Sequence, residues 1–257
     1  MSVNTVTEER VAIVTIDHRP VNALDRQTLQ ELGQAADALK NDAAVKVVIV
    51  TGGGSLAFVA GADIKEVGQL ASAQEAQQMA ALGQHVFLKL QRLGKPVIAA
   101  INGVCLGGGL ELAMSCHLRI AGDRARFGQP EVNLGIMPGW GGTQRLPRLI
   151  GKMKATEWIL TGDMYTAQEA ARLGLVNMVV PQDQVLKAAK DMARKIAAKG
   201  GVAIAQSLAA IEEGMDLPLE QGLAKEASAF SRVASSEDSK EGVKAFLEKR
   251  QPRFQDR

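Results

Sequence analysis

Two acidic residues, Glu111 and Glu131, each follow a backbone turn that is rich in glycine or proline. Glu111 comes soon after the glycine run at residues 107–109, and Glu131 directly follows Pro130. A helix start leaves free N–H groups, and glycine lets a ligand approach them closely. If a helix begins at Gly108, its N–H and the Glu111 carboxylate lie on one face. These groups could perform acid–base chemistry beside a developing oxyanion.

Short apolar runs and turns position both acids. Residues 96–101 (PVIAAI) predict a buried strand that leads into the glycine turn. From Gly108 the apolar spacing changes to that of a short helix, whose first turn begins at the glycines. Pro130 suits the first position of another helical turn, which places Glu131 near a second helix start.

A third turn lies within residues 57–66 (AFVAGADIKE), which are expected to form a loop that starts a helix. The chain turns at Gly61, and Asp63 is a suitable helix cap. The N–H of Ala62 would then stand at the turn, free to donate. The segments AGAD, GGGLE and FGQPE together supply two backbone donors and two carboxylates, whereas one glycine turn alone is usually a simple connector.

The order of the expected elements predicts an α/β fold with parallel strands. Residues 11–16 (VAIVTI) and 45–50 (VKVVIV) predict buried strands, and a helix from the cap Asp25 to about Lys40 lies between them. Strand, helix and strand in this order favour a parallel unit. The other elements expected before the C-terminal region are a helix at 72–93 and strands at 118–121 and 175–180.

The chain after Pro181 is expected to be helical. Four successive helices with alanine-rich faces suit close helix packing. They cover residues 183–198, 202–213, 218–234 and 236–250. A helical tail of this length after an α/β body suggests packing against the body or against another subunit.

The length and composition are ordinary for a globular protein. The 257 residues can bury a full core; 46% of them are hydrophobic and 23% are charged. The 30 basic and 28 acidic residues are mixed along the chain and leave a formal charge of +2, so no nucleic-acid partner is indicated. Cys105 and Cys116 suit neither a disulfide framework nor a zinc motif, which favours a reducing, cytoplasmic setting. Neither a signal peptide nor an apolar run of membrane-spanning length is found, so no membrane association is expected.

Nucleotide and metal sites lack support in the sequence. The glycine runs at 52–54 and 107–109 do not match GxGxxG, and no P-loop frame is present. His18, His85 and His117 are scattered without ligand spacing, so no metal site is predicted.

Four motifs resemble those of the enoyl-CoA hydratase/isomerase (crotonase) superfamily, in the same order along the chain. They are AFVAGADIKE, KPVIAAINGVCLGGGLELAMSC, FGQPEVNLGIMPGWGGTQRLPRLIG and LTGDMYTAQEAARLGLVNMVVP, and the ending EGVKAFLEKRQPRF resembles the superfamily's C-terminal helix. The resemblance covers essentially the whole chain. It implies an α/β spiral of ββα units over residues 1–195 and a helical C-terminal trimerisation region over residues 196–257. A homotrimer, or a homohexamer formed as a dimer of trimers, is the implied assembly.

By motif position, the resemblance also implies an active site. The N–H groups of Ala62 and Gly108 would form the oxyanion hole. Glu111 and Glu131 would be the acid–base pair, and Gly139 would offer its N–H to the attacking water. The residues implied to bind the acyl-CoA substrate are Val21, Ala23, Ala60, Ala62, Asp63, Ile64, Lys65, Gly108 and Trp140.

The implied reaction is the hydration of a 2-trans-enoyl-CoA to a 3-hydroxyacyl-CoA, in fatty acid β-oxidation or a related acyl-CoA pathway. The oxyanion hole would stabilise the enolate that forms on the thioester. Glu111 is assigned to the water that attacks C3, and Glu131 to the proton delivered to C2. Two ionised acids beside one water repel each other, so one pKa should be raised. Coenzyme A enters as part of the substrate, and no metal or redox cofactor is needed.

Three positions depart from the usual superfamily pattern. His117 stands where aspartate is more common, and Val59 stands where a smaller residue is common; both bear on local packing more than on activity. Trp140 is bulkier than the residue often found at its position and is expected to shorten the acyl pocket, although burial alone explains a tryptophan equally well.

Two alternative functions remain open at this point. In an enoyl-CoA isomerase the acid matching Glu131 is kept, whereas the position matching Glu111 is typically not acidic, so the pair favours hydration. A non-catalytic or RNA-binding protein on the same scaffold would need a basic stripe, and the interleaved charges provide none.

Overall fold

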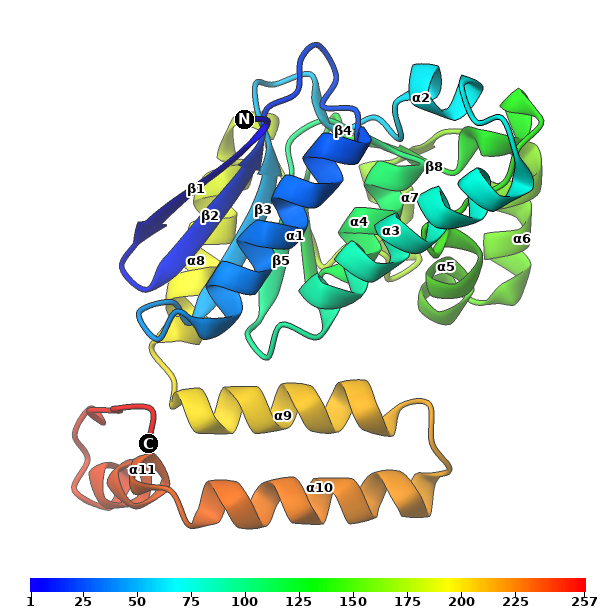
Figure 1. The fold of residues 1–257 in the computed structure, drawn as a ribbon. Helices are drawn as coiled ribbons and strands as arrows, with labels where there is room; N and C mark the ends of the chain where they lie inside the picture. Colours follow the sequence, from blue (N-terminus) through cyan, green and yellow to red (C-terminus); the bar gives the residue numbers. More distant parts are fainter.

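The computed structural model describes residues 1–257 as an α/β body from which a pair of long helices projects (Figure 1). The body contains two sheets. The larger sheet consists, in spatial order, of β1 (Val3–Glu8), β2 (Val11–Ile16), β3 (Val47–Gly52), β5 (Val97–Ile101), β7 (Leu118–Gly122) and β10 (Met178–Val180). Only β1 and β2 pair antiparallel; all other neighbours are parallel. Every residue of β3 and β5 is buried, as expected for parallel strands covered on both faces.

The smaller sheet is built from very short strands. Its order is β4 (Ala57–Val59), β6 (Val104–Leu106), β8 (Arg126–Gly128) and β9 (Tyr165–Thr166). The strands β3, β5 and β7 of the larger sheet are each followed by a strand of the smaller sheet and then by helical structure. The expected spiral of ββα units is therefore confirmed.

Helices cover both faces of the larger sheet. Those of the body are α1 (Arg26–Asn41), α2 (Ile64–Gly68), α3 (Ala73–Gln91), α4 (Gly108–Ser115), α5 (Gly142–Ile150), α6 (Lys152–Thr161), α7 (Ala167–Arg172) and α8 (Val185–Ala197), with short 3₁₀ turns η1 (Pro130–Leu134) and η2 (Gln182–Gln184). The main core lies between the larger sheet and the layer that contains α1, α3 and α4. A second core lies on the opposite sheet face, where α8 packs through Val185, Ala189 and Ala193. No helix is both long and apolar enough to cross a membrane.

Local sequence explains where the body helices begin. The Asp25 side chain accepts a hydrogen bond from the N–H of Thr28 at the start of α1, as the sequence predicts. Ser72 caps α3 in the same way through the N–H of Glu75. Gly107 precedes α4 with a φ of +51°, a conformation that glycine adopts readily.

The C-terminal helices form an arm, here defined as α9 (Gly201–Gly214), α10 (Leu219–Ala234) and α11 (Glu237–Leu247). Helices α9 and α10 run side by side, outside the α/β body (Figure 1). No residue of α9 is fully buried, and Ala229 is the only buried residue of α10. A groove between these two helices is lined by exposed apolar side chains, among them Ile211, Leu223 and Phe230.

A latch formed by Asp256 ties the beginning of the arm to the body. The Asp256 carboxylate accepts a hydrogen bond of 2.7 Å from the N–H of Gly201. It also pairs with Lys46 and Arg10 of the body. Asp238 of α11 is 4% exposed, and its carboxylate accepts a hydrogen bond of 2.8 Å from the N–H of Asp256. This bond holds Asp256 against the arm. Segments far apart in sequence are therefore joined by one carboxylate.

Some boundaries differ from those expected from the sequence. The strand expected at 45–50 lies at 47–52, and the one expected at 175–180 begins only at Met178. The stretch 57–66 was expected to be a loop, but it contains β4. The division between residues 195 and 196 stays a prediction; α8 runs through this point, and the arm begins at Gly201.

Candidate active site

Glu111 is a buried carboxylate on the first turn of α4. The residue is 1% exposed. Its Oε1 accepts hydrogen bonds from the N–H of Trp140 at 2.8 Å and from the N–H of Gly142 at 2.7 Å. Burial raises the pKa of Glu111 to about 6, although these backbone donors and the Arg145 charge oppose the rise. A carboxylate of this kind is fixed in position and can take up a proton near neutral pH.

Glu131 lies beside the same helix start. Pro130 begins η1, so Glu131 stands in its first turn as expected. A β-carbon added at Gly107 would lie 3.1 Å from Glu131 Oε1, which places this carboxylate against the backbone that leads into α4. Burial, and after it the charge of Glu111, raises the pKa of Glu131 to about 7. The structure therefore brings both predicted acids together.

The two expected oxyanion donors also lie close together. Leu24 pairs with the residues on either side of Ala62: its N–H donates to Gly61 at 2.9 Å, and its carbonyl accepts from Asp63 at 3.0 Å. The N–H of Ala62 is therefore directed away from this pairing. A β-carbon at Gly108 would lie 3.4 Å from the Ala62 nitrogen and only 2.4 Å from the Trp140 ring. The Gly108 N–H is at the first position of α4 and has no acceptor within its helix.

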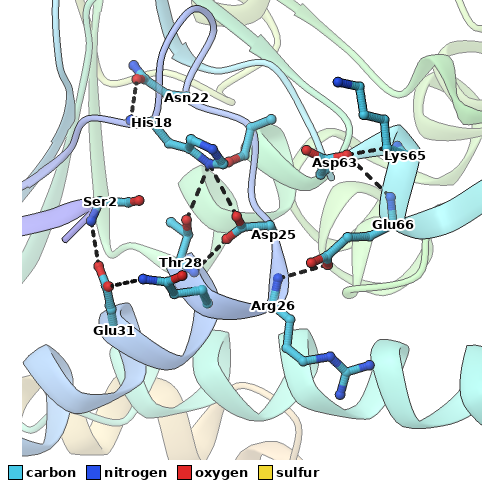
Figure 2. A network of polar contacts seen from close by, with 12 residues as sticks. Ser2, His18, Asn22, Asp25, Arg26, Thr28, Glu31, Asp63, Lys65 and Glu66 are labelled. Carbon is cyan, nitrogen blue, oxygen red and sulfur yellow. Dashed lines mark hydrogen bonds and ion pairs between the residues drawn. The ribbon is translucent and has the colours of Figure 1, made fainter. Parts of the chain in front are cut away.

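The residues expected near the CoA portion form a second cluster around the Ala62 turn. The N–H of Ala60 donates to the Val21 carbonyl at 3.1 Å. The Ala23 carbonyl lies 2.8 Å from His18 Nδ1. Figure 2 shows the polar network that surrounds this segment. It includes Asp63, whose carboxylate caps α2 by accepting from the N–H groups of Lys65 and Glu66.

The exposed part of this cluster is formed by the first turn of α2. The side chain of Ile64 is exposed, and so is that of Lys65. The structure thus gathers Val21, Ala23 and residues 60–65 around the turn that carries Ala62, while their binding roles stay predictions.

The loop at residues 139–142 holds Glu111 through contacts that the sequence does not predict. Gly139 was expected to orient water; its carbonyl accepts from Gln84 Nε2 at 2.8 Å, and the water role stays a prediction. The N–H groups that hold Glu111 belong to Trp140 and Gly142. Sequence reasoning missed them, although the run GWGG before a helix did mark a loop with accessible N–H groups.

Trp140 itself is packed between α3 and α4. It is 4% exposed and meets Phe87 edge to face, with ring centroids 5.8 Å apart. Its Nε1 donates to the Met79 carbonyl at 3.2 Å. The close approach of its ring to Gly108 places the indole next to an expected oxyanion donor.

The two cysteines and His117 are structural. Cys105 and Cys116 are free and buried, and burial raises the pKa of Cys116 to about 12, so these thiols stay protonated. His117 Nδ1 accepts from the N–H of Val97 at 2.9 Å, and its Nε2 donates to the Gln91 carbonyl at 3.0 Å. Burial lowers the His117 pKa, which favours this neutral form. No group of three or more His, Cys, Asp or Glu side chains is placed to hold a metal ion.

The raised carboxyl pKa values predict a pH-dependent effect on stability. Glu131 has an ordinary pKa of 4.5 and a folded-state pKa of about 7. Its contribution to stability is therefore complete below pH 4.5 and is lost as the pH rises through about 7. The Tm of Glu131→Gln minus the Tm of the parent should therefore increase when the pH is raised from about 5 to about 8.

Thermal denaturation at both pH values, monitored by circular dichroism, measures this gain. Glu220→Gln on the exposed surface of α10 is the matched control. A Tm difference between Glu131→Gln and the parent that is the same at both pH values would contradict the expected linkage.

Comparison with known proteins agrees with this fold. A family model described as enoyl-CoA hydratase/isomerase matches residues 6–257. The chain is 48% identical over 248 residues to a crotonyl-CoA hydratase from Syntrophomonas wolfei, covering 96% of this chain and 95% of the relative. It is 48% identical over 244 residues to a short-chain-enoyl-CoA hydratase from Clostridium acetobutylicum, with coverage of 95% and 93%. A crystal structure of an enoyl-CoA hydratase from Bacillus anthracis matches with a TM-score of 0.97 and 38% identity over 100% of both chains. The chain belongs to the enoyl-CoA hydratase/isomerase family.

Proposed function

We propose that this protein is an enoyl-CoA hydratase, a hydro-lyase that adds water across the 2,3 double bond of a 2-trans-enoyl-CoA to give a 3-hydroxyacyl-CoA. The observation that carries the proposal is the placement of both Glu111 and Glu131 at the start of α4, next to the N–H groups of Ala62 and Gly108. The names of relatives at 48% identity support the same reaction.

In the proposed mechanism the thioester oxygen accepts hydrogen bonds from the Ala62 and Gly108 N–H groups. These hydrogen bonds become stronger as negative charge develops on the thioester oxygen of the enolate, which lowers the activation barrier for hydration. Burial raises the pKa of Glu111, but its Oε1 is held by two backbone N–H donors that favour the ionised form. Its ionised form removes a proton from the water that attacks C3.

Glu131 is the proposed proton source for C2. Its pKa of about 7 keeps a large share of this carboxyl protonated near neutral pH. The difference in environment thus supports the assignment of the base to Glu111 and of the acid to Glu131. An isomerase needs a single acid that moves a proton, so the buried, doubly held Glu111 favours hydration over isomerisation. Fatty acid β-oxidation or a related acyl-CoA pathway is the proposed setting.

A panel of 2-trans-enoyl-CoA thioesters, from about C4 to about C16, tests the proposed reaction. Hydration removes the conjugated double bond, so the enoyl absorbance should fall and the 3-hydroxyacyl-CoA should be recovered by mass spectrometry. Conversion of 3-enoyl-CoA without any hydration of 2-enoyl-CoA would instead favour the isomerase alternative.

Trp140 is expected to limit the length of the acyl chain. Its indole fills the space between Gly83 of α3 and Gly108 of α4. Replacement by alanine should shift the preference from short towards longer acyl chains, because the removed ring leaves room beside the thioester site. The profile of kcat/KM against chain length measures the shift, and Trp140→Phe, which keeps an aromatic ring there, is the matched control. An unchanged profile in Trp140→Ala would exclude Trp140 from the acyl pocket.

We propose that the arm, within the expected region 196–257, holds subunits together as a homotrimer or as a hexamer of two trimers. Apolar side chains line the groove of α9 and α10, and Phe230 is 71% exposed in the single chain. An exposed apolar surface of this kind is typical of a subunit interface. Sedimentation at micromolar concentration should therefore show a trimer or hexamer.

A charged substitution tests which surface carries this assembly. Phe230→Glu should lower the oligomeric state, because it places a charge in the apolar groove. Val6→Glu, at an exposed apolar position of β1 in the body, should leave the state unchanged. A monodisperse monomer of the parent chain would contradict the proposed assembly.

A further inference from the structure

Arg145 supports the loop that holds Glu111. It lies on α5, and its Nη1 donates to the Trp140 carbonyl at 3.0 Å. The N–H of the same Trp140 residue donates to Glu111 Oε1. The backbone between Trp140 and Gly142 approaches the guanidinium so closely that a β-carbon at Gly141 would lie 2.1 Å from Nη1. Arg145 therefore fixes one side of the loop, while Glu111 accepts from the other.

A second bond from Arg145 leads away from the active site to the arm. Its Nε donates to Gln91 Oε1 at 3.1 Å, at the end of α3. The Gln91 amide in turn donates through Nε2 to Glu212 Oε2 of α9 at 2.9 Å. Glu212, Gln91 and Arg145 thus form a continuous chain of hydrogen bonds from the arm to the Trp140 carbonyl.

The residue types in this series of hydrogen bonds suit their positions. Each link uses a different atom of Gln91, so a single amide joins an acceptor on the arm to a cation in the body. The arginine is partly buried, where hydrogen bonds to a charged group are stronger than at the surface. Arg148, one turn later on α5, is exposed. Its Nη1 donates to the Gln144 carbonyl of its own helix, and its Nε pairs at 3.6 Å with Asp216, which lies between α9 and α10. Both arginines therefore reach the arm, but of the two Arg145 alone also donates to the Trp140 carbonyl of the loop that holds Glu111.

We propose that Arg145 is a positioning residue for Glu111, and that Gln91 and Glu212 make this positioning depend on the seating of the arm against the body. The inference rests on the hydratase function proposed above. Oxygen Oε1 of Glu111 depends on two N–H groups of one loop, so a small displacement of that loop moves the carboxylate relative to the attacking water. A misplacement of about 1 Å can cost about 10²-fold in rate. Through this series of hydrogen bonds, contacts that the arm makes in the assembly affect the position of Glu111, although the arm does not touch the substrate.

Arg145→Gln tests the first link. We expect kcat to fall by about 10-fold to 10²-fold, with KM changing by less than about threefold, because the lost interaction acts on the reacting geometry and not on binding. The groups that face Glu111 are the Arg145 cation, the Glu131 carboxyl and the loop N–H groups. Loss of the cation should therefore raise the pKa of Glu111 and move the acidic limb of the kcat profile to higher pH. Arg145→Lys keeps the positive charge but cannot donate to both Trp140 and Gln91 as the guanidinium does. It should therefore restore the pH of the acidic limb more fully than it restores kcat.

Two outer variants and one control complete the set. Gln91→Met and Glu212→Ala each cut the link to the arm, and both should lower kcat in the same direction as Arg145→Gln but by less. Arg148→Gln removes the same charge from the exposed face of α5, together with an exposed ion pair to Asp216 that makes no bond to the Trp140 carbonyl, and should leave kcat and its pH profile unchanged. If Arg145→Gln does not fold, Arg145→Lys and Gln91→Met test the effect of the lost hydrogen bonds on kcat.

A mutant cycle with Glu111→Gln decides whether Arg145 acts through Glu111. Once Glu111 has lost its proton chemistry, adding Arg145→Gln should lower the residual rate by less than about twofold. An equal loss in both backgrounds, or an unchanged kcat and pH profile in the single variants, would overturn the positioning role. The proposed function fails separately, if Glu111→Gln alone hydrates 2-enoyl-CoA at the parent rate.

Discussion

Replacing Glu111 or Glu131 with glutamine should lower the rate of 2-enoyl-CoA hydration by at least about 10²-fold, the lower end for acid–base catalysis. Glutamine keeps the shape of the side chain and removes its proton chemistry. At position 111 the amide oxygen can still accept from the N–H groups of Trp140 and Gly142, so the loop should stay in place. The lost rate therefore reports on chemistry and not on folding.

The double variant and proton exchange sharpen this test. Because both acids act on one water and one enolate, the combined loss should be smaller than the product of the two single losses. Exchange of the C2 proton with solvent should partly survive in Glu111→Gln, since Glu131 still reaches that carbon. Glu220→Gln on the arm surface should keep the parent rate. Hydration by folded Glu111→Gln at nearly the parent rate would reduce Glu111 to a helix-start acid and leave the isomerase alternative.

Replacing Gly109 with alanine should have the largest effect on stability. A β-carbon there would lie 2.0 Å from the carbonyl oxygen of Val59 and 2.7 Å from its carbonyl carbon. Both atoms belong to the backbone of β4, which cannot turn aside as a flexible side chain can. We expect the free energy of unfolding to fall by about 3 kcal/mol, the upper end for overpacking. Urea denaturation measures this loss.

The same substitution should also impair catalysis in whatever fraction still folds. Moving α4 away from β4 separates the Gly108 N–H from that of Ala62, so the shared oxygen site is disturbed. Gly68→Ala is the matched control, because a β-carbon at the end of α2 meets nothing within 4 Å. Equal unfolding midpoints for Gly109→Ala and the parent would show that α4 and β4 can separate freely.

Elements with dense apolar patterns could be predicted from the sequence, and sparse or very short ones could not. The strand at residues 11–16 and the helix from Gly108 lie where their patterns place them. β1 was missed because only Val3 of its six residues is buried, so it carries little apolar signal. β4 and β6 have three residues each, too few for a periodicity to show.

The candidate site divides in the same way. Glu111, Glu131, Ala62 and Gly108 could be named because local turn chemistry marks each of them, and the family resemblance assigns their roles. The hydrogen bonds from the N–H groups of Trp140 and Gly142 to Glu111 join residues about 30 positions apart in sequence. They depend on how α5 packs against α4. Arg145 was missed for the same reason, since nothing near it in sequence shows that it faces Gln91.

The position of Asp256 late in the sequence also determines when, during synthesis, the arm gains its contacts with Arg10 and Lys46. A polypeptide is made from its N-terminus, and segments that emerge first can fold first. Asp256 follows all three helices of the arm, so the carboxylate that joins Arg10, Lys46 and Gly201 is synthesised after everything it holds. On the ribosome the body can close around its core while the arm still lacks the Asp256 contacts. A nascent chain that stalls before this segment therefore holds its arm to the body through other contacts, such as the Gln91–Glu212 hydrogen bond, without the Asp256 carboxylate.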